Sequence, residues 1–215
     1  MNTLFLASKS RSRRELLDFC RIPYQLVALD ADESQHPALG LLELVQYLAE
    51  LKMQHVRLPA PGVALTPESR CWVLTADTLG MNAAGELCRK PVDRADAIRM
   101  IRSYRQGAVT ATGFCVERRC WQPTAQVWQL EQRLVRVASA KYCFNVPEHR
   151  LDEYLDLGFS GISYLAVSGA VEIERFGIQY LEGLEGSYTA IVGLPMYEVR
   201  LALEQLGFYV APVLD

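Results

Sequence analysis

Residues 3–17, TLFLASKSRSRRELL, place an apolar run, a basic loop and the start of a helix in direct succession. The run at 3–7 is typical of a buried strand. Ser12 and Glu15 have the spacing of a capping box, whereas Ser10 is an equally suitable helix cap. Between strand and helix, residues 8–14 hold four cations and three hydroxyl groups. Because a helix N-terminus favours an anion, this loop predicts a phosphate-binding site, with a solvated basic turn as the alternative.

Two further residues stand out by their position in predicted elements. Residues 41–56 predict a helix, and Lys52 shares its apolar face with Val45 and Leu48. A lysine on such a face either extends to solvent along its stem or reaches a buried anion. Asp77 follows the apolar run at 72–76, and the carboxyl end of a strand is where open α/β sheets bind ligands. Asp77 could bind Mg²⁺ or take a proton from water there, or it could open a turn before Gly80.

The remaining chain sets the class of protein. The 215 residues are 50% hydrophobic with a net charge of −3, which excludes a disordered chain and a general basic surface for nucleic acid. No apolar run is long enough to span a membrane, and the first residues lack the order of a secretory signal. Six scattered cysteines without a CxxC pair fit reduced thiols of the cytoplasm. Alternating strand and helix patterns predict one α/β domain, residues 1–215, with a partly antiparallel sheet.

Seven short segments resemble the Maf family of nucleoside triphosphate pyrophosphatases and occur in the family's order. LASKSRSRRELL at 6–17 is similar to the family's LASxSPRRxELL, and Asp32 and Glu33 are similar to its VDE. LAELK at 48–52, ADT at 76–78 and GELCRKP at 85–91 match LAxxKA, ADT and GxxxxKP. TG at 112–113, and GSY at 186–188 followed by VGLP at 192–195, complete the set. The resemblance covers almost the whole chain.

This resemblance implies a fold, a reaction and a set of residues. The fold would be an elongated, bent mixed sheet flanked by helices, with two lobes around a central cleft, as in inosine triphosphate pyrophosphatases. The reaction would convert a nucleoside triphosphate and water into the monophosphate and pyrophosphate, with Mg²⁺ or Mn²⁺. Asp77 would accept the proton, and Glu33 and Asp77 would hold the metal. The residues expected to grip the triphosphate are Ser8, Ser10, Arg13, Lys52 and Lys90. The resemblance also implies a possible homodimer, while the acidic net charge and the lack of a long apolar run predict no nucleic-acid or membrane partner.

Three family positions that tune the choice of base fall on Ser12, Thr78 and Glu174. Members that act on dTTP and UTP usually have Arg, Thr and Gln there, so only Thr78 agrees. Members that act on 7-methyl-GTP tend to have Trp, Gln and Glu, so only Glu174 agrees. A carboxylate accepts hydrogen bonds only, which favours a base edge with two N–H donors and hence a modified purine over a pyrimidine. The alternative function is a nucleotide-sensing regulator of cell division or septum formation with little catalysis.

Overall fold

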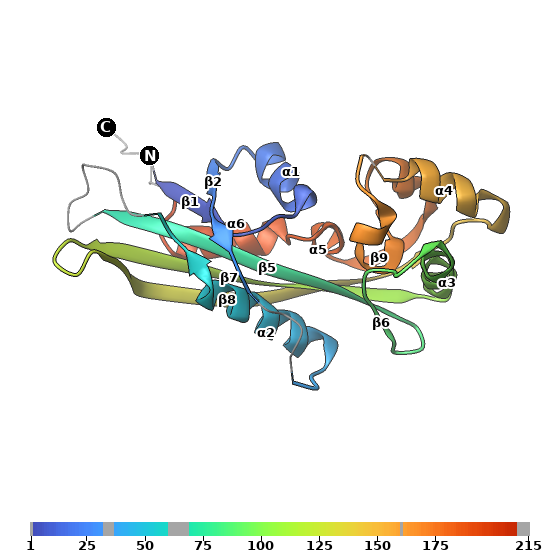
Figure 1. Cartoon of the computed structure of the whole chain (residues 1–215), viewed down its shortest axis with the longest axis horizontal. Coiled ribbons are helices and arrows are strands. Elements are labelled where there is room, and N and C mark those ends of the chain that lie inside the picture. The colour runs from blue at the N-terminus through green and yellow to red at the C-terminus, as the bar shows by residue number, and fades with distance from the viewer. Residues whose placement is uncertain (1, 32–36, 60–68, 160, 210–215) are drawn as a thin grey trace.

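The computed structural model describes residues 2–31, 37–59, 69–159 and 161–209. It shows a long mixed sheet with helices on both faces (Figure 1). The strands are β1 (Thr3–Leu6), β2 (Tyr24–Leu26), β3 (Ala28–Leu29), β4 (Val56–Arg57), β5 (Arg70–Asn82), β6 (Leu87–Cys88), β7 (Ala108–Gln122), β8 (Val127–Phe144) and β9 (Leu181–Gly186). The helices are α1 (Arg11–Phe19), α2 (Leu41–Gln54), α3 (Arg94–Tyr104), α4 (Leu151–Leu157), α5 (Tyr188–Val192) and α6 (Met196–Gln205). The predicted α/β class, with a mixed sheet flanked by helices, is confirmed.

The sheet combines a parallel edge with a long antiparallel centre. Within the described residues its order is β2-β1-β5-β7-β8-β9, with β6 paired to β5, while β3 and β4 form a separate pair. Strand β1 lies parallel to both β2 and β5, whereas the β5–β7, β7–β8 and β8–β9 pairs are antiparallel. Strand β1 ends opposite Leu74, but β5 continues to Asn82 on its pairing with β7. The sheet therefore narrows beside the second half of β5, where a crevice can open.

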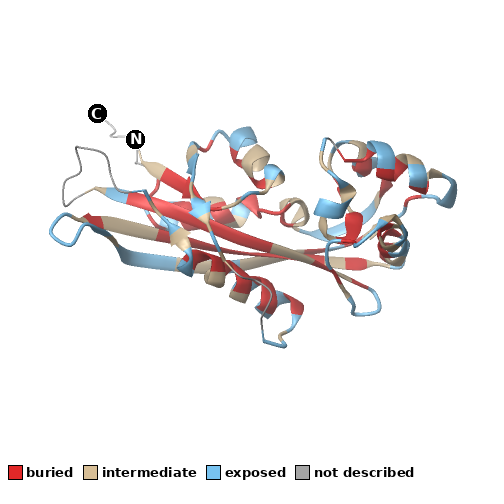
Figure 2. Ribbon diagram, viewed as in Figure 1, coloured by how far each residue is buried: buried red, intermediate tan, exposed pale blue. Residues whose placement is uncertain are grey.

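Two separate hydrophobic clusters stabilise the two ends of the molecule. One packs α6 against β1, β5 and β7 through residues such as Leu74, Phe114 and Leu203. The other joins α3, α4 and the end of β8, with Phe144 and Tyr154 fully buried. Figure 2 shows buried residues concentrated along the central strands and inside the α3–α4 end. In the part of the chain that the structure describes, every helix is too short or too polar to cross a bilayer.

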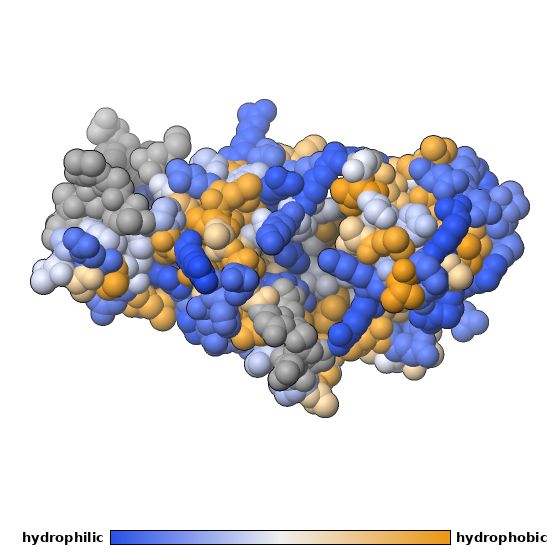
Figure 3. Space-filling model, viewed as in Figure 1, coloured by the Kyte–Doolittle hydropathy of each residue, from blue (hydrophilic) through white to orange (hydrophobic). Residues whose placement is uncertain are grey.

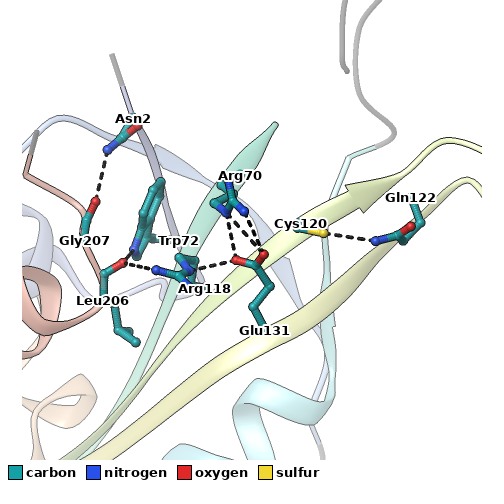
Figure 4. A network of polar contacts seen from close by, with 9 residues as sticks. All are labelled: Asn2, Arg70, Trp72, Arg118, Cys120, Gln122, Glu131, Leu206 and Gly207. Carbon is teal, nitrogen blue, oxygen red and sulfur yellow. Dashed lines mark hydrogen bonds and ion pairs between the residues drawn. The ribbon is translucent and has the colours of Figure 1, made fainter. Parts of the chain in front are cut away.

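A polar network closes the sheet at the end near β1 (Figure 4). Glu131 on β8 accepts hydrogen bonds from Arg70 on β5 and Arg118 on β7. Trp72 Nε1 donates to the carbonyl of Leu206 at 2.9 Å, and Arg118 donates to the same oxygen at 3.2 Å. These bonds tie three adjacent strands to the end of α6, so this end of the sheet is held by side chains as well as by the strand ladder.

Candidate active site

A cleft of about 1080 Å³ lies between the α1 side and the α3–α4 side of the molecule. In the space-filling view, hydrophilic side chains occupy the middle of this face between two apolar areas (Figure 3). The cleft is lined by these residues predicted from the sequence: Ser8, Ser10, Ser12, Arg13, Lys52, Asp77, Thr78, Lys90 and Glu174. Glu33 lies outside the described residues. The structure thus brings the predicted residues that it describes to one cleft, although they come from five separate segments.

The basic loop after β1 folds back on itself before α1 begins. The Ser8 hydroxyl accepts a hydrogen bond from the backbone N–H of Ser10 at 3.2 Å. Ser10 is the N-cap of α1, where its hydroxyl accepts from the backbone N–H of Arg13. Of the two caps that the sequence allowed, the structure has Ser10, because α1 starts at Arg11 and Ser12 is already inside the helix. The first turn contains no acidic side chain, so its positive end faces the cleft uncompensated by its own residues.

Arg13 is held rigidly although it carries a charge. It is 9% exposed, and its Nε donates to the carbonyl of Gly193 at 2.8 Å. Its other two nitrogens donate to Ser8 Oγ at 3.2 Å and to Thr78 Oγ1 at 3.0 Å. Gly193 has a φ of 125°, a conformation that favours glycine, and this turns its carbonyl towards the guanidinium group. The motifs around residues 8, 78 and 193 therefore meet at one arginine, whose rigid fork suits phosphate recognition.

Lys52 and Asp77 form a buried ion pair on the floor of the cleft. Lys52 is 8% exposed and Asp77 is 7% exposed, and the Nζ and Oδ1 atoms lie 2.5 Å apart. Lys52 does not extend to solvent, because its aspartate lies directly below the apolar face of α2. A buried charge without a partner is costly, so each group offsets the cost of burying the other and fixes its position.

The predicted position of Asp77 at the end of a strand is wrong. Asp77 lies within β5, opposite Gly113 of β7, and the strand continues for five more residues. The pairing with β7 carries β5 past the point where β1 ends opposite Leu74. Asp77 still reaches the crevice, because the parallel neighbour has ended and α1 begins beyond it. The turn before Gly80 is likewise not observed, since Gly80 is itself paired in β5.

Gly113 explains how α2 comes close enough for this pair to form. A Cβ atom at position 113 would lie 2.4 Å from the carbonyl oxygen of Val45 in α2. The absence of a side chain therefore lets α2 pack directly on β7, next to Asp77 on β5. Thr112 precedes Gly113 in the Thr-Gly motif at 112–113. Its hydroxyl donates to the carbonyl of Ala190 at 2.6 Å and lies 2.7 Å from Thr78 Oγ1. This short motif thus positions both the helix that carries Lys52 and the wall beside Arg13.

The second oxygen of Asp77 is suited to a metal ion or to a water molecule. Asp77 Oδ2 is buried and has no hydrogen-bond partner among the described residues. A hard divalent cation binds carboxylate oxygens, so an unpaired oxygen on a side chain that lines a cleft fits such an ion. In the described ranges no cluster of three or more His, Cys, Asp and Glu side chains surrounds a common point. Asp77 is thus the described residue that fits such an ion.

The three predicted specificity residues lie in two places. Thr78 bonds Arg13 and Thr112, so it belongs to the scaffold of the part of the cleft that holds Arg13 and Lys52, here called the basic end. Ser12 and Glu174 contact each other from opposite parts of the chain. Burial raises the pKa of Glu174, and a hydrogen bond from the Ser12 side chain opposes that rise. Lys90 is exposed on the loop after β6, where it lines the same cleft.

The sequence reasoning missed a cluster of charges next to Glu174. Glu15 on α1 accepts hydrogen bonds from Arg11 at 2.7 Å and from Arg175 at 2.8 Å, which joins the two sides of the cleft. Glu172 lines the cleft as well. The alternation of charged and apolar residues in Glu-Ile-Glu, 172–174, is the signal that could have found it, because residues i and i+2 of an extended segment point the same way.

A basic helix N-terminus opposite a buried lysine–aspartate pair, in one cleft of a mixed α/β fold, defines an anion-binding α/β protein. The chain belongs to the Maf-like protein family, whose model matches residues 3–206. It is 31% identical over 198 residues to a nucleoside triphosphate pyrophosphatase of Synechococcus sp. (strain CC9311), covering 92% of this chain and 96% of that protein. It is 32% identical to a dTTP/UTP pyrophosphatase of Citrifermentans bemidjiense, covering 96% of each. A dTTP/UTP pyrophosphatase of Geobacter sulfurreducens is 30% identical, over 95% of this chain and 96% of that protein.

Proposed function

We propose that this protein is a nucleoside triphosphate pyrophosphatase, which hydrolyses a non-standard or excess nucleotide to the monophosphate and pyrophosphate. The observation that carries the proposal is the buried Lys52–Asp77 pair in the cleft that Arg13 also lines, with Asp77 Oδ2 left without a partner among the described residues. The names of the pyrophosphatase relatives support the same reaction.

The basic end of the cleft would hold the triphosphate. Arg13 presents a fixed guanidinium group, and the loop at residues 8–10 adds hydroxyl and backbone donors at the start of α1. Lys52 and Lys90 supply two further cations from α2 and from the loop after β6. Negative charge builds up on the leaving pyrophosphate as the bond breaks, and fixed cations at those oxygens stabilise it without reorganisation.

Asp77 would act as the proton acceptor. Lys52 holds Oδ1, so Oδ2 is left to take a proton from a water molecule in line with the α-phosphorus. The water oxygen bonds to that phosphorus, the bond to the bridging oxygen breaks, and pyrophosphate leaves with the electron pair. Asp77 and Glu33 would hold Mg²⁺ or Mn²⁺, and such an ion supplies charge neutralisation at phosphate oxygens and a more acidic water.

The base would lie at the other end of the cleft, against Ser12 and Glu174. Its identity follows from which edge these side chains can bond. Glu174 supports a modified purine such as 7-methylguanine, whereas Thr78 agrees with members that act on dTTP and UTP. We also propose that residues 1–215 form one domain that acts in the cytoplasm, for which the match over 3–206 and the six free cysteines give support.

The reaction is tested by measuring pyrophosphate release from dTTP, UTP, CTP and 7-methyl-GTP with Mg²⁺ or Mn²⁺. We expect release from at least one of them, and its loss in Asp77→Asn with nucleotide binding retained. If the parent protein binds nucleotides but releases no pyrophosphate from any of them, the alternative function is correct, which is a nucleotide-sensing regulator of cell division or septum formation. Release by Asp77→Asn at the parent rate would remove Asp77 from the role of proton acceptor.

A further inference from the structure

One part of the cleft wall, here called the acidic end, combines apolar and acidic side chains. The lining of the cleft includes the apolar side chains of Ile162 and Val167 together with the acids Glu172 and Glu174. Carboxyl groups repel phosphate oxygens, so this wall suits the base of a nucleotide better than its polyphosphate. If the protein binds a nucleoside triphosphate, as proposed above, this end faces the base, and its acids are the polar groups that the base meets.

Glu172 is held in place by its backbone, while its side chain has no hydrogen-bond partner among the described residues. The Tyr154 hydroxyl accepts from the backbone N–H of Glu172 at 2.9 Å. Gly177 supports the same turn, because a Cβ atom there would collide with the carbonyl oxygen of Glu172. Glu172 is only 9% exposed, and within the described ranges no hydrogen bond or ion pair engages its carboxyl group. The carboxyl oxygens of Glu172 are not among the fully buried atoms, so the group is accessible from the cleft that it lines, where a ligand group can bond it.

Burial and the neighbouring carboxyl group favour the protonated form of Glu172. Burial, and then the neighbouring Glu174, raise the pKa of Glu172 to about 7, while Arg175 and Arg11 lower it and Glu15 raises it slightly. Burial also raises the pKa of Glu174, against the effect of Ser12 and Arg175. With a pKa of about 7, Glu172 can donate a proton near neutral pH, beside a second carboxyl group that lines the same cleft.

We propose that Glu172 is a specificity-determining residue, which acts with Glu174 to select a base edge that has two adjacent N–H donors beside a carbonyl group, as in guanine. The ionised carboxylate accepts both N–H groups, and the protonated carboxyl group donates to the carbonyl oxygen. Glu172 and Glu174 are two residues apart in an extended segment, and Ile173 between them is buried in the core of the α3–α4 end. This places both carboxyl groups on the cleft side.

The same pair disfavours thymine and uracil. Their edge has one N–H donor between two carbonyl oxygens, so one carbonyl oxygen would face a carboxylate oxygen without a proton between them. A site with buried polar groups rejects a ligand that leaves them unpaired more strongly than one that lacks only an apolar contact. Glu172 therefore turns the preference away from the substrates named for the dTTP/UTP pyrophosphatase relatives.

The test compares kcat/KM for GTP, ITP and dTTP in the parent, Glu172→Ala and Glu172→Gln, at about pH 6 and about pH 8.5. ITP lacks only the 2-amino group of the guanine edge. We expect the parent to prefer GTP over ITP and dTTP, and Glu172→Ala to lower the GTP-to-dTTP ratio by about tenfold to a hundredfold. Glu172→Gln should keep the ratio of the parent at low pH and lose its pH dependence, because an amide is always a neutral donor.

The matched control is Glu185→Gln, an exposed acid of β9 that does not line the cleft, and it should leave every ratio unchanged. An unchanged ratio in Glu172→Ala, or a parent that prefers dTTP, would overturn the proposal. If Glu172→Ala fails to fold, the pH dependence of Glu172→Gln decides. If no triphosphate releases pyrophosphate, the proposed reaction fails. The ratio of GMP to dTMP dissociation constants, measured by calorimetry in the same variants, then tests Glu172 independently.

Discussion

The two ends of the cleft are built in opposite ways. At the basic end, Arg13 bonds three neighbouring groups and Lys52 pairs with Asp77, so the charged side chains are fixed by the protein itself. At the acidic end, Glu172 has no partner in the described part of the chain, and Arg175 adopts a left-handed φ of 49°. In the proposed function the basic end would face the phosphates that every nucleoside triphosphate shares, whereas the acidic end would face the base, which differs. Side chains fixed in advance thus suit the triphosphate, which all these substrates share, and side chains without a protein partner suit the choice between bases.

The substitution with the largest expected effect is at Asp77, in the centre of the basic end. Asp77→Asn should lower kcat for pyrophosphate release by about a thousandfold, because an amide cannot take a proton. Nucleotide binding, measured by calorimetry, should persist since Arg13 and Lys90 are untouched. Asp152→Asn makes the same change at an exposed position of α4 and should leave kcat unaltered. A rate in Asp77→Asn within a factor of ten of the parent would contradict this division of roles.

The packing that supports the basic end is tested at Gly113. Gly113→Ala should lower the free energy of unfolding by about 3 kcal/mol, because the new Cβ atom would push α2 away from β7. The shift would also move Lys52 from Asp77 and reduce kcat. Urea unfolding together with a pyrophosphate assay checks both effects. Full stability with full activity would show that α2 has no need of this close contact.

The pH dependence of the free energy of unfolding tests the account of the acidic end. The pKa of Glu172 is raised from 4.5 to about 7, so the folded chain keeps a proton that the unfolded chain has lost across that range. The contribution of Glu172 to the free energy of unfolding should therefore be greatest below about pH 4.5. It should fall by about 2 kcal/mol as the pH rises to 7. Glu172→Gln should remove this fall, as measured by urea unfolding at about pH 5 and pH 8. A parallel pH profile in the two proteins would mean that Glu172 titrates normally.

The smallest effect concerns the strained residue at the mouth of the cleft. Arg175→Gly relieves a left-handed backbone but loses the exposed ion pair with Glu15, so the unfolding free energy should change by less than about 1 kcal/mol. Gln126→Gly relieves a φ of 53° in the β7–β8 turn with no ion pair to lose. The difference between the two variants therefore measures the Glu15–Arg175 contact. A loss above about 2 kcal/mol in Arg175→Gly alone would make that contact a main support of the cleft.

Sequence reasoning predicted the two ends unequally. The mixed fold followed from local patterns, and Lys52 was recognised because a cation on an apolar face needs a reason. Asp77 was placed at a strand end because the apolar run stops there, yet the pairing with β7 carries the strand onward. Glu172 was not predicted as a site residue, because its position in the cleft depends on contacts with Tyr154 and Gly177 that form only on folding. Local periodicity indicates elements, but it does not indicate which polar group is left without a partner.

The central claim, that water attacks the α-phosphorus at Asp77, is tested by hydrolysis in water enriched in oxygen-18. With the triphosphate that is turned over fastest, mass spectrometry of the products should find the label in the nucleoside monophosphate and none in pyrophosphate. Label in pyrophosphate or in inorganic phosphate would place the attack at another phosphorus and would contradict the account.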